Sequence, residues 1–223
     1  MDGVERIRWL PPFAPLESLD GVENVGFRDE LQELTRRVAT SAHAWTNDER
    51  QKVTEIFDVR ASDWGSRSKP TYFLPLIDAL DRGGVPSRGT CIEIGSGTGL
   101  QSPTLLGHFD EVISLDLSFE MIARSPRNGV RLLLTDASQL PFRSECAKAI
   151  VCVNAFLFAK EYDRVLEKAG FLVFVSTRGE KTPIYLSPEA VLEAMSSATK
   201  RDFVATCGRA GEGIWSVVTE APT

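Results

Sequence analysis

TCIEIGSGTGL, residues 90–100, joins a short apolar run to a glycine-rich turn. The apolar run is typical of a buried strand, and the turn leads into a predicted helix over residues 100–107. Gly95, Gly97 and Gly99 let the backbone turn tightly and approach a ligand closely, because glycine has no Cβ. In an open α/β sheet, such a turn lies at the carboxyl end of the first strand, where ligands bind. The stretch therefore predicts a ligand-binding α/β sheet.

Residues 85–223 repeat this pattern, with short apolar runs alternating with helical stretches. The predicted strands cover residues 90–94, 112–115, 130–134, 148–153, 170–176, 203–207 and 214–219. The predicted helices cover residues 100–107, 118–124, 160–168 and 188–198, the second with Ser118 and the last with Ser187 as N-cap. Alternation favours parallel strands joined by helices, and continuous apolar runs favour a sheet covered on both faces. The last two strands are joined by the short RAGEG, so we expect an antiparallel hairpin there.

Residues 1–84 form a predicted N-terminal arm and helical extension, or lid, in front of the core at 85–223. The first 26 residues are rich in proline and glycine, so we expect little regular structure in them. Helices are predicted over 27–42, over 47–57 with Asn47 as N-cap, and over 71–81.

Composition excludes several classes of protein. The chain has 223 residues, of which 43% are hydrophobic and 25% charged, so it can bury a core and is not disordered. The net charge of −6 leaves no positive surplus for a nucleic-acid backbone. No apolar run approaches the roughly 20 residues of a membrane helix, and the start MDGVE does not resemble a signal peptide. We expect a cytoplasmic protein that binds neither nucleic acid nor membrane.

The cysteines and histidines indicate no metal site. The four cysteines are Cys91, Cys146, Cys152 and Cys207. They form no CxxC pair, which favours small buried side chains in a reducing compartment. The two histidines, His43 and His108, stand far from one another and from any cluster of ligands. We therefore expect no bound metal.

Acidic residues stand at the ends of three successive predicted strands. Glu93 lies at the mouth of the glycine turn, where a carboxylate repels a pyrophosphate but suits a cation such as the amino group of a methionine moiety. Asp116, 21 residues after Gly95, can accept hydrogen bonds from both hydroxyls of a ribose. Asp136 and the Ala137 amide can contact an adenine edge. Together they predict a site for an adenosine bearing a cationic group.

The sequence resembles the class I S-adenosylmethionine-dependent methyltransferases of the type-11 group, which includes ubiquinone/menaquinone methyltransferase-like proteins. The resemblance covers about residues 85–220. It rests on EIGSGTG (93–99), VISLDLSFEMI (112–122), TDASQLPF (135–142), AIVCVNAFLF (149–158) and RVLEKAGFLVFVS (164–176). Two departures are that Ala169-Gly170 stands where two glycines are common, and that the loop after the fourth strand carries Asn154 without an acidic residue or histidine.

This resemblance implies a Rossmann-like, mostly parallel seven-stranded sheet in the order 3-2-1-4-5-7-6, with strand 7 antiparallel and helices on both faces. It also implies S-adenosylmethionine as methyl donor and S-adenosylhomocysteine as product. The positions that match donor-binding motifs are Glu93, Gly95, Ser96, Gly97, Thr98, Gly99, Asp116, Leu117, Met121, Asp136, Ala137 and Asn154.

The resemblance further implies that the acceptor is held by the N-terminal extension and by the segments after the fourth and fifth strands. Candidate substrate contacts in those segments are Trp64, Arg67, Tyr72, Arg178 and Thr182. An oxygen acceptor usually needs a base to take its proton, whereas an amine need only be neutral. The candidate catalytic residues are His43, Asn154 and Glu180.

The predicted function is therefore methyl transfer from S-adenosylmethionine to a small molecule, by a monomer or homodimer, with the O, N or C acceptor atom open. One alternative is a non-catalytic or regulatory protein that binds the same donor. Another is a nicotinamide-dependent oxidoreductase, which the GxGxG spacing, Glu93 and the terminal hairpin disfavour. Nucleic-acid methylation is disfavoured because VNAF stands where amino-methylating DNA enzymes carry (D/N)PP(Y/F).

Overall fold

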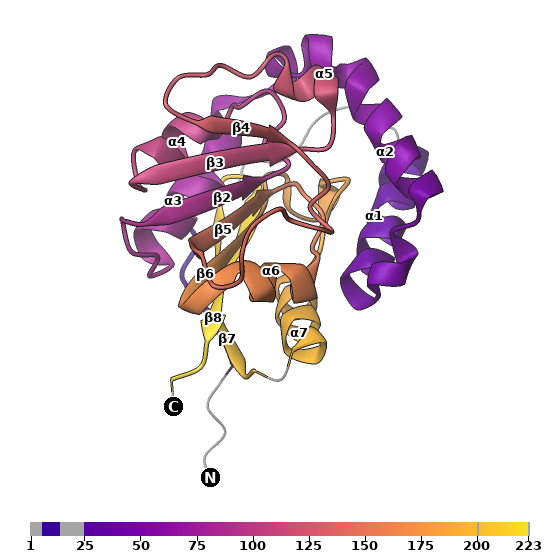
Figure 1. Ribbon diagram of the computed structural model, residues 1–223. Helices are drawn as coiled ribbons and strands as arrows, with labels where there is room; N and C mark the ends of the chain where they lie inside the picture. Colours follow the sequence, from indigo (N-terminus) through magenta and orange to yellow (C-terminus); the bar gives the residue numbers. More distant parts are fainter. Residues whose placement is uncertain (1–5, 14–24, 200, 223) are drawn as a thin grey trace.

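The computed structural model describes residues 6–13, 25–199 and 201–222, without the side chains of Val25 and Arg67. A single sheet forms its centre (Figure 1). Its strands are β1 (Ile7–Trp9), β2 (Thr90–Ile94), β3 (Glu111–Asp116), β4 (Arg131–Leu134), β5 (Ala147–Val153), β6 (Leu166–Ser176), β7 (Phe203–Ala210) and β8 (Gly213–Glu220). They are arranged in the order β1-β7-β8-β6-β5-β2-β3-β4.

The order from β4 to β7 is the predicted 3-2-1-4-5-7-6, and this prediction is confirmed. The strand β8 runs antiparallel to both β6 and β7, as the short RAGEG connection requires, and the other pairs are parallel. The Rossmann-like fold class is therefore the one expected.

The strand β1 is an addition to the predicted sheet. Little regular structure was expected in residues 1–26, yet Ile7–Trp9 pairs in parallel with β7 at the sheet edge. The Leu10 amide extends this pairing by donating to the Cys207 carbonyl at 2.8 Å. Three residues are too few to show a strand pattern, and their partner lies almost 200 positions further along the chain. The expectation was wrong here because only the tertiary contact creates the strand.

The helices of the described residues are α1 (Val25–Thr40), α2 (Asn47–Arg60), α3 (Leu74–Arg82), α4 (Ser102–Leu106), α5 (Phe119–Ile122), α6 (Ala159–Val165) and α7 (Pro188–Ala198). Short 3-10 segments occupy Ala42–Ala44, Ala61–Asp63, Gly65–Arg67, Pro70–Phe73 and Gly179–Lys181. None of the helices in this part of the chain is long and apolar enough to cross a membrane.

Local side-chain caps explain where several helices begin. Ser118 and Ser187 cap α5 and α7 as predicted, each accepting a backbone N–H with its hydroxyl. The predicted N-cap of α2 is wrong by one residue, because the Thr46 hydroxyl accepts the Glu49 N–H at 3.2 Å and Asn47 is already helical. The strand β6 follows α6 directly, and Ala169 lies inside β6 where its pairing with β5 shifts register, with a φ of 55° that favours glycine.

Side chains alternate between two apolar layers on the faces of the sheet. Ile92 and Ile150 belong to the larger layer, which also contains buried side chains of α1, α2, α6 and α7. Cys91 and Val151 belong to the second layer, with the buried side chains of α3 and α4. Both faces are covered, which is why the central strands are continuously apolar. In Figure 1, α1 and α2 lie on the side toward which β3 and β4 point, beyond the carboxyl ends of the strands.

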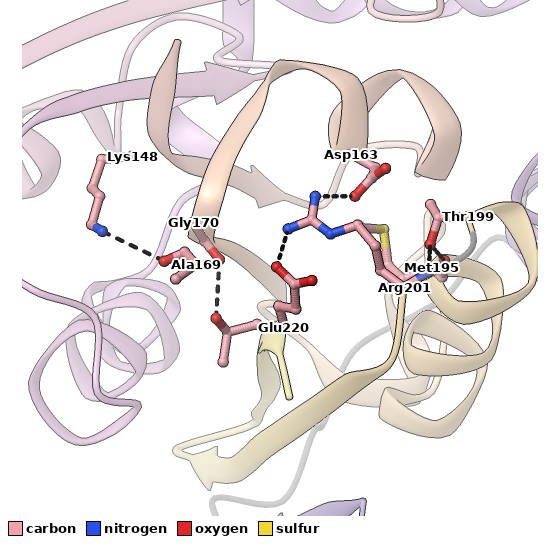
Figure 2. A network of polar contacts seen from close by, with 9 residues as sticks. Lys148, Asp163, Ala169, Gly170, Met195, Thr199, Arg201 and Glu220 are labelled. Atoms are coloured by element: carbon pink, nitrogen blue, oxygen red, sulfur yellow. Dashed lines mark hydrogen bonds and ion pairs between the residues drawn. The ribbon is translucent and has the colours of Figure 1, made fainter. Parts of the chain in front are cut away.

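A polar network joins three elements at the opposite end of the sheet (Figure 2). The Arg201 guanidinium donates to Asp163 on α6 and to Glu220 at the end of β8, each at 2.7 Å. Arg201 thereby lowers the pKa of Glu220. This arginine precedes β7, so its two ion pairs link the two strands of the terminal hairpin and fasten the hairpin to α6.

Candidate active site

A cavity of about 580 Å³ lies at the carboxyl ends of the central strands, beneath α1 and α2. This volume is in the range of pockets that bind one drug-sized ligand. Its floor is the glycine turn after β2 and the ends of β3, β5 and β6, and its roof is formed by one face of each of the two N-terminal helices. It is the position at which α/β sheets of this type bind their ligands.

The glycine turn adopts the backbone conformation that only glycine takes readily. Gly95, Gly97 and Gly99 have φ values of 64°, 57° and 76°. The indole of Trp64 lies across the turn, since a Cβ added to Gly97 would stand 3.4 Å from its Nε1. A residue of the N-terminal extension therefore covers the turn directly.

Glu93 is a buried carboxyl group at the base of the cavity, with 2% of its surface exposed. Its Oε2 accepts hydrogen bonds from Ser102 Oγ at 2.7 Å and Ser114 Oγ at 2.5 Å. Burial raises the pKa of Glu93 from 4.5 to about 7, although both serines act in the opposite direction. A cation entering the cavity would favour the ionised carboxylate.

Asp116 connects the end of β3 to the glycine turn. Its Oδ2 accepts the Gly97 N–H at 2.7 Å, and its Oδ1 accepts the Ser118 N–H at 2.8 Å. Burial raises the pKa of Asp116, and these two bonds lower it. The carboxylate thus helps to hold the turn as well as facing the cavity.

Asp136, beyond β4, is reached by two residues of the N-terminal extension. Trp45 Nε1 lies 3.2 Å from each of its carboxylate oxygens, and Arg50 Nη1 lies 3.4 Å from Oδ2. The Ser138 N–H also donates to this carboxylate, at 2.8 Å. The residue predicted to meet adenine therefore also fastens the roof of the cavity to its floor.

Asn154 joins the ends of β5 and β6 across the cavity floor. It has a φ of 54°, and its Nδ2 donates to Thr177 Oγ1 while its Oδ1 accepts the Thr177 N–H, both at 2.9 Å. Its amide is thus engaged in positioning the two strand ends.

Two buried polar atoms of the cavity wall have no hydrogen-bond partner among the described residues. They are Ser96 Oγ, in the glycine turn, and Gln101 Oε1, just after it. A buried polar atom without a partner is energetically costly, so both favour a polar ligand. Together with the glycine turn and the strand-end carboxylates, they fit an amino-acid-bearing adenosine such as S-adenosylmethionine.

Comparison with known proteins identifies a related domain. Residues 92–174 match the model of a family described as a methyltransferase domain. No curated protein sequence matches the chain. Residues 92–174 are therefore similar to a methyltransferase domain, and the fold is that of S-adenosylmethionine-dependent methyltransferases.

Solved structures share the fold of this methyltransferase domain. A chain from the Haloferax volcanii complex of the Trm112 methyltransferase activator with a methyltransferase has a TM-score of 0.61 and 16% identity, over 74% of this chain and 98% of that one. An S-adenosylmethionine-dependent methyltransferase from Thermotoga maritima has a TM-score of 0.58 and 20% identity, over 75% and 99%. DhpI, solved with S-adenosylhomocysteine, has a TM-score of 0.58 and 20% identity, over 78% and 98%.

Most of the predicted site residues line the cavity of the methyltransferase domain. They are Glu93, Gly95, Ser96, Gly97, Asp116, Leu117, Met121, Asp136, Ala137, Asn154, Trp64, Tyr72, Arg178 and Thr182. Thr98 and Gly99 belong to the turn but do not line the cavity. His43 and Glu180 are exposed in 3-10 segments outside it, and the side chain of Arg67 lies outside the described residues. Around the cavity and in the rest of the described chain, no three acidic, cysteine or histidine side chains gather as metal ligands.

Sequence reasoning missed the aromatic wall of the cavity. Trp45 lies 5.0 Å from Phe156 and 5.5 Å from Phe158 between ring centroids, and Phe57 lies 5.7 Å from Trp64. Trp45 and Phe57 come from the N-terminal extension and Phe156 and Phe158 from the loop after β5. Phe57 ends the helix predicted over 47–57, but nothing local indicated which surface that helix would meet.

Proposed function

We propose that this chain transfers a methyl group from S-adenosylmethionine to a small-molecule acceptor. The observation that carries the proposal is that Glu93, Asp116 and Asp136, at three successive strand ends, line one cavity with the glycine turn. Each carboxylate matches a different part of the donor. A single carboxylate would not support the assignment of a donor site, because loop carboxylates are common on protein surfaces.

Within this proposal, Glu93 pairs with the donor's ammonium group and Asp116 accepts hydrogen bonds from its ribose. Asp136 and the Ala137 amide contact the adenine edge, between the apolar side chains of Leu117 and Met121. The donor supplies an already activated methyl group on a sulfonium. The protein's own contribution is then alignment of the acceptor and exclusion of water.

We further propose that the extension preceding residue 85 acts as a lid over the core at 85–223. Trp45 and Arg50 reach Asp136, and Asp58 accepts the Ser118 hydroxyl, so the lid is fastened at the carboxylate-bearing end of the cavity. A roofed cavity of about 580 Å³ favours a small acceptor over a polymer. Of the candidate catalytic residues, Asn154 is the one within reach of such an acceptor, whereas His43 and Glu180 face solvent.

Calorimetric titration with S-adenosylhomocysteine tests the donor assignment, with NAD as the control ligand. We expect micromolar binding of the first and none of the second. Asp116→Ala should weaken binding by about 1–3 kcal/mol, the usual effect of removing a buried hydrogen-bonding partner. Asp81→Ala, at an exposed position on α3, is the matched control and should bind as the unchanged protein does.

Two results would contradict the proposal. Binding of NAD in place of S-adenosylhomocysteine would indicate an oxidoreductase. Equal affinity of Asp116→Ala and Asp81→Ala would remove Asp116 from the donor site. Donor binding without turnover of any acceptor would instead favour the non-catalytic alternative.

A further inference from the structure

The charged residues that line the cavity are separated by sign. The carboxylates Glu93, Asp116 and Asp136 belong to β2, β3 and the segment after β4. The cations that line it come from α1, α2 and the segment after β6, and they are Arg28, Arg60, Arg178 and Lys181. Because β5 separates β2 from β6 in the sheet, the carboxylates leave the β2, β3 and β4 side of the cavity, its acidic end, and Arg178 and Lys181 leave the β6 side, its basic end.

Contacts between three elements bring the cations together. The Arg60 guanidinium lies over the Phe27 ring, 4.4 Å from its centroid, and Arg28 is the next residue along α1. One turn further, Gln32 Nε2 donates to the carbonyls of Glu180 and Thr182 at 2.8 and 2.9 Å. These two bonds seat α1 on the segment that carries Arg178 and Lys181. The basic end of the cavity is therefore built by the packing of α1 against α2 and this segment.

The cavity wall next to these cations includes the apolar side chains of Phe27, Leu31, Phe57, Pro183 and Ile184. Charges in such surroundings are screened less than charges in open water, so they attract an anion more strongly. Among the described residues Arg60 forms no ion pair, and its guanidinium donates to the Ile56 carbonyl at 2.8 Å.

We propose that the methyl acceptor is a small aromatic carboxylate. Its ring lies against the aromatic side chains of Phe27 and Phe57, and its carboxylate is held by the basic end of the cavity, with Arg60 as a principal contact. Planar guanidinium groups match a carboxylate with two parallel hydrogen bonds, and aromatic rings favour edge or offset contacts with a ring. The inference rests on the proposed function, because the acidic end is reserved for the donor.

Matched sets of compounds test the charge of the acceptor. Phenylacetate and indole-3-acetate, their amides, and the amines phenethylamine and tryptamine are titrated into protein saturated with S-adenosylhomocysteine. We expect the acids to bind at millimolar concentration or below, and the amides and amines at least about tenfold more weakly. Equal or tighter binding of the amides or amines, or no binding of either acid, would overturn the proposal. Tighter binding of phenyl phosphate than of either acid would overturn the assignment of a carboxylate.

Variants test where the carboxylate binds. Arg60→Gln should weaken binding of the acid about tenfold and leave the affinity for S-adenosylhomocysteine unchanged. Lys181→Gln, from a different element, should also weaken binding of the acid. Arg36→Gln, on the exposed face of α1, is the matched control and should change neither affinity. An equal loss of S-adenosylhomocysteine affinity in Arg60→Gln would mean that the cation serves the donor's own carboxylate, and would overturn the proposal.

The two proposals fail in different ways. If the unchanged protein does not bind S-adenosylhomocysteine, the proposed function fails first. If it binds S-adenosylhomocysteine but no aromatic acid, only the acceptor inference fails.

Discussion

Glu93 is held between opposing influences on its protonation. Burial disfavours the carboxylate, whereas Ser102 and Ser114 donate hydrogen bonds that favour it. The balance puts the pKa of Glu93 at about 7, so its charge changes near neutral pH. This pKa predicts that the charge of the group facing the ligand's ammonium changes with pH.

We predict that the affinity for S-adenosylhomocysteine rises about tenfold between roughly pH 6 and pH 8, because the ionised fraction of Glu93 rises by that factor around a pKa of about 7. Calorimetry across this range measures it. Glu93→Gln, which cannot ionise, should bind more weakly and with little dependence on pH. An equally steep pH profile in Glu93→Gln would assign the effect to another group.

The free energy of unfolding should fall as pH rises, whereas the ligand affinity rises, and it should do so over a lower range of pH. The native carboxyl keeps its proton up to about pH 7, whereas the unfolded one loses it near 4.5. The native state therefore binds more protons between these values, and the free energy of unfolding falls as pH rises through them, by up to about 3 kcal/mol. The difference from Glu93→Gln in urea unfolding isolates this contribution.

At the scale of elements, α2 decides how the cavity is closed. Val53, Phe57 and Arg60 lie on one face of the helix and line the cavity. Asp58, beside that face, accepts the Ser118 hydroxyl and the Glu120 N–H, which ties α2 to the start of α5. Since Ser118 also lines the cavity, this link connects the lid to the floor.

Asp58→Ala should loosen α2 without unfolding the sheet. We expect the free energy of unfolding to fall by about 1 kcal/mol, because two hydrogen bonds at a partly buried position are lost. Hydrogen exchange in residues 47–60 should become faster. Glu55→Ala, on the exposed side of the same helix, is the control and should leave this exchange unchanged. Unchanged exchange in Asp58→Ala would show that the other contacts of α2 suffice to hold it.

At the scale of the whole molecule, one end of the sheet forms the ligand cavity and the other end carries a stabilising polar network. The cavity lies at the carboxyl ends of β2, β3, β5 and β6, whereas the Arg201 network of Figure 2 lies at the other end. The antiparallel register of β6 and β8 explains the separation, since it places Thr219 opposite Phe171, far along β6 from Ser176.

Arg201→Gln should therefore reduce stability and leave ligand binding intact. Loss of the guanidinium leaves Asp163 and Glu220 without their shared cation, and we expect unfolding to become easier by about 1–3 kcal/mol. This corresponds to a fall in Tm of about 2–4 °C per kcal/mol for a chain of this size. Lys148→Gln, which removes only an exposed hydrogen bond of 3.5 Å to Ala169 and a cation–π contact with Phe171, is the control and should change Tm little. A marked loss of S-adenosylhomocysteine affinity in Arg201→Gln would contradict the inference that this network stabilises the fold without affecting the cavity.

The sequence by itself determined the alternation of strands and helices, the terminal hairpin, the glycine turn and the three strand-end carboxylates, whereas the strand order was implied by the resemblance to the type-11 methyltransferases. These features depend on short-range patterns, because apolar runs and glycines define strand and turn locally, and parallel pairing then aligns the strand ends at one edge. Ala169 shows the limit of such patterns, since nothing in the local sequence predicts the left-handed backbone conformation of an alanine within β6.

Only the tertiary structure decided what covers the cavity. The contact of Trp45 with Asp136 joins residues 91 positions apart, and β1 pairs with a strand almost 200 positions away. The tertiary structure also places His43 and Glu180 at the surface. It brings the cations Arg28, Arg60, Arg178 and Lys181 into the wall of one cavity. Local periodicity states that a helix has an apolar face but not which surface that face meets, since that choice depends on the packing of the whole chain.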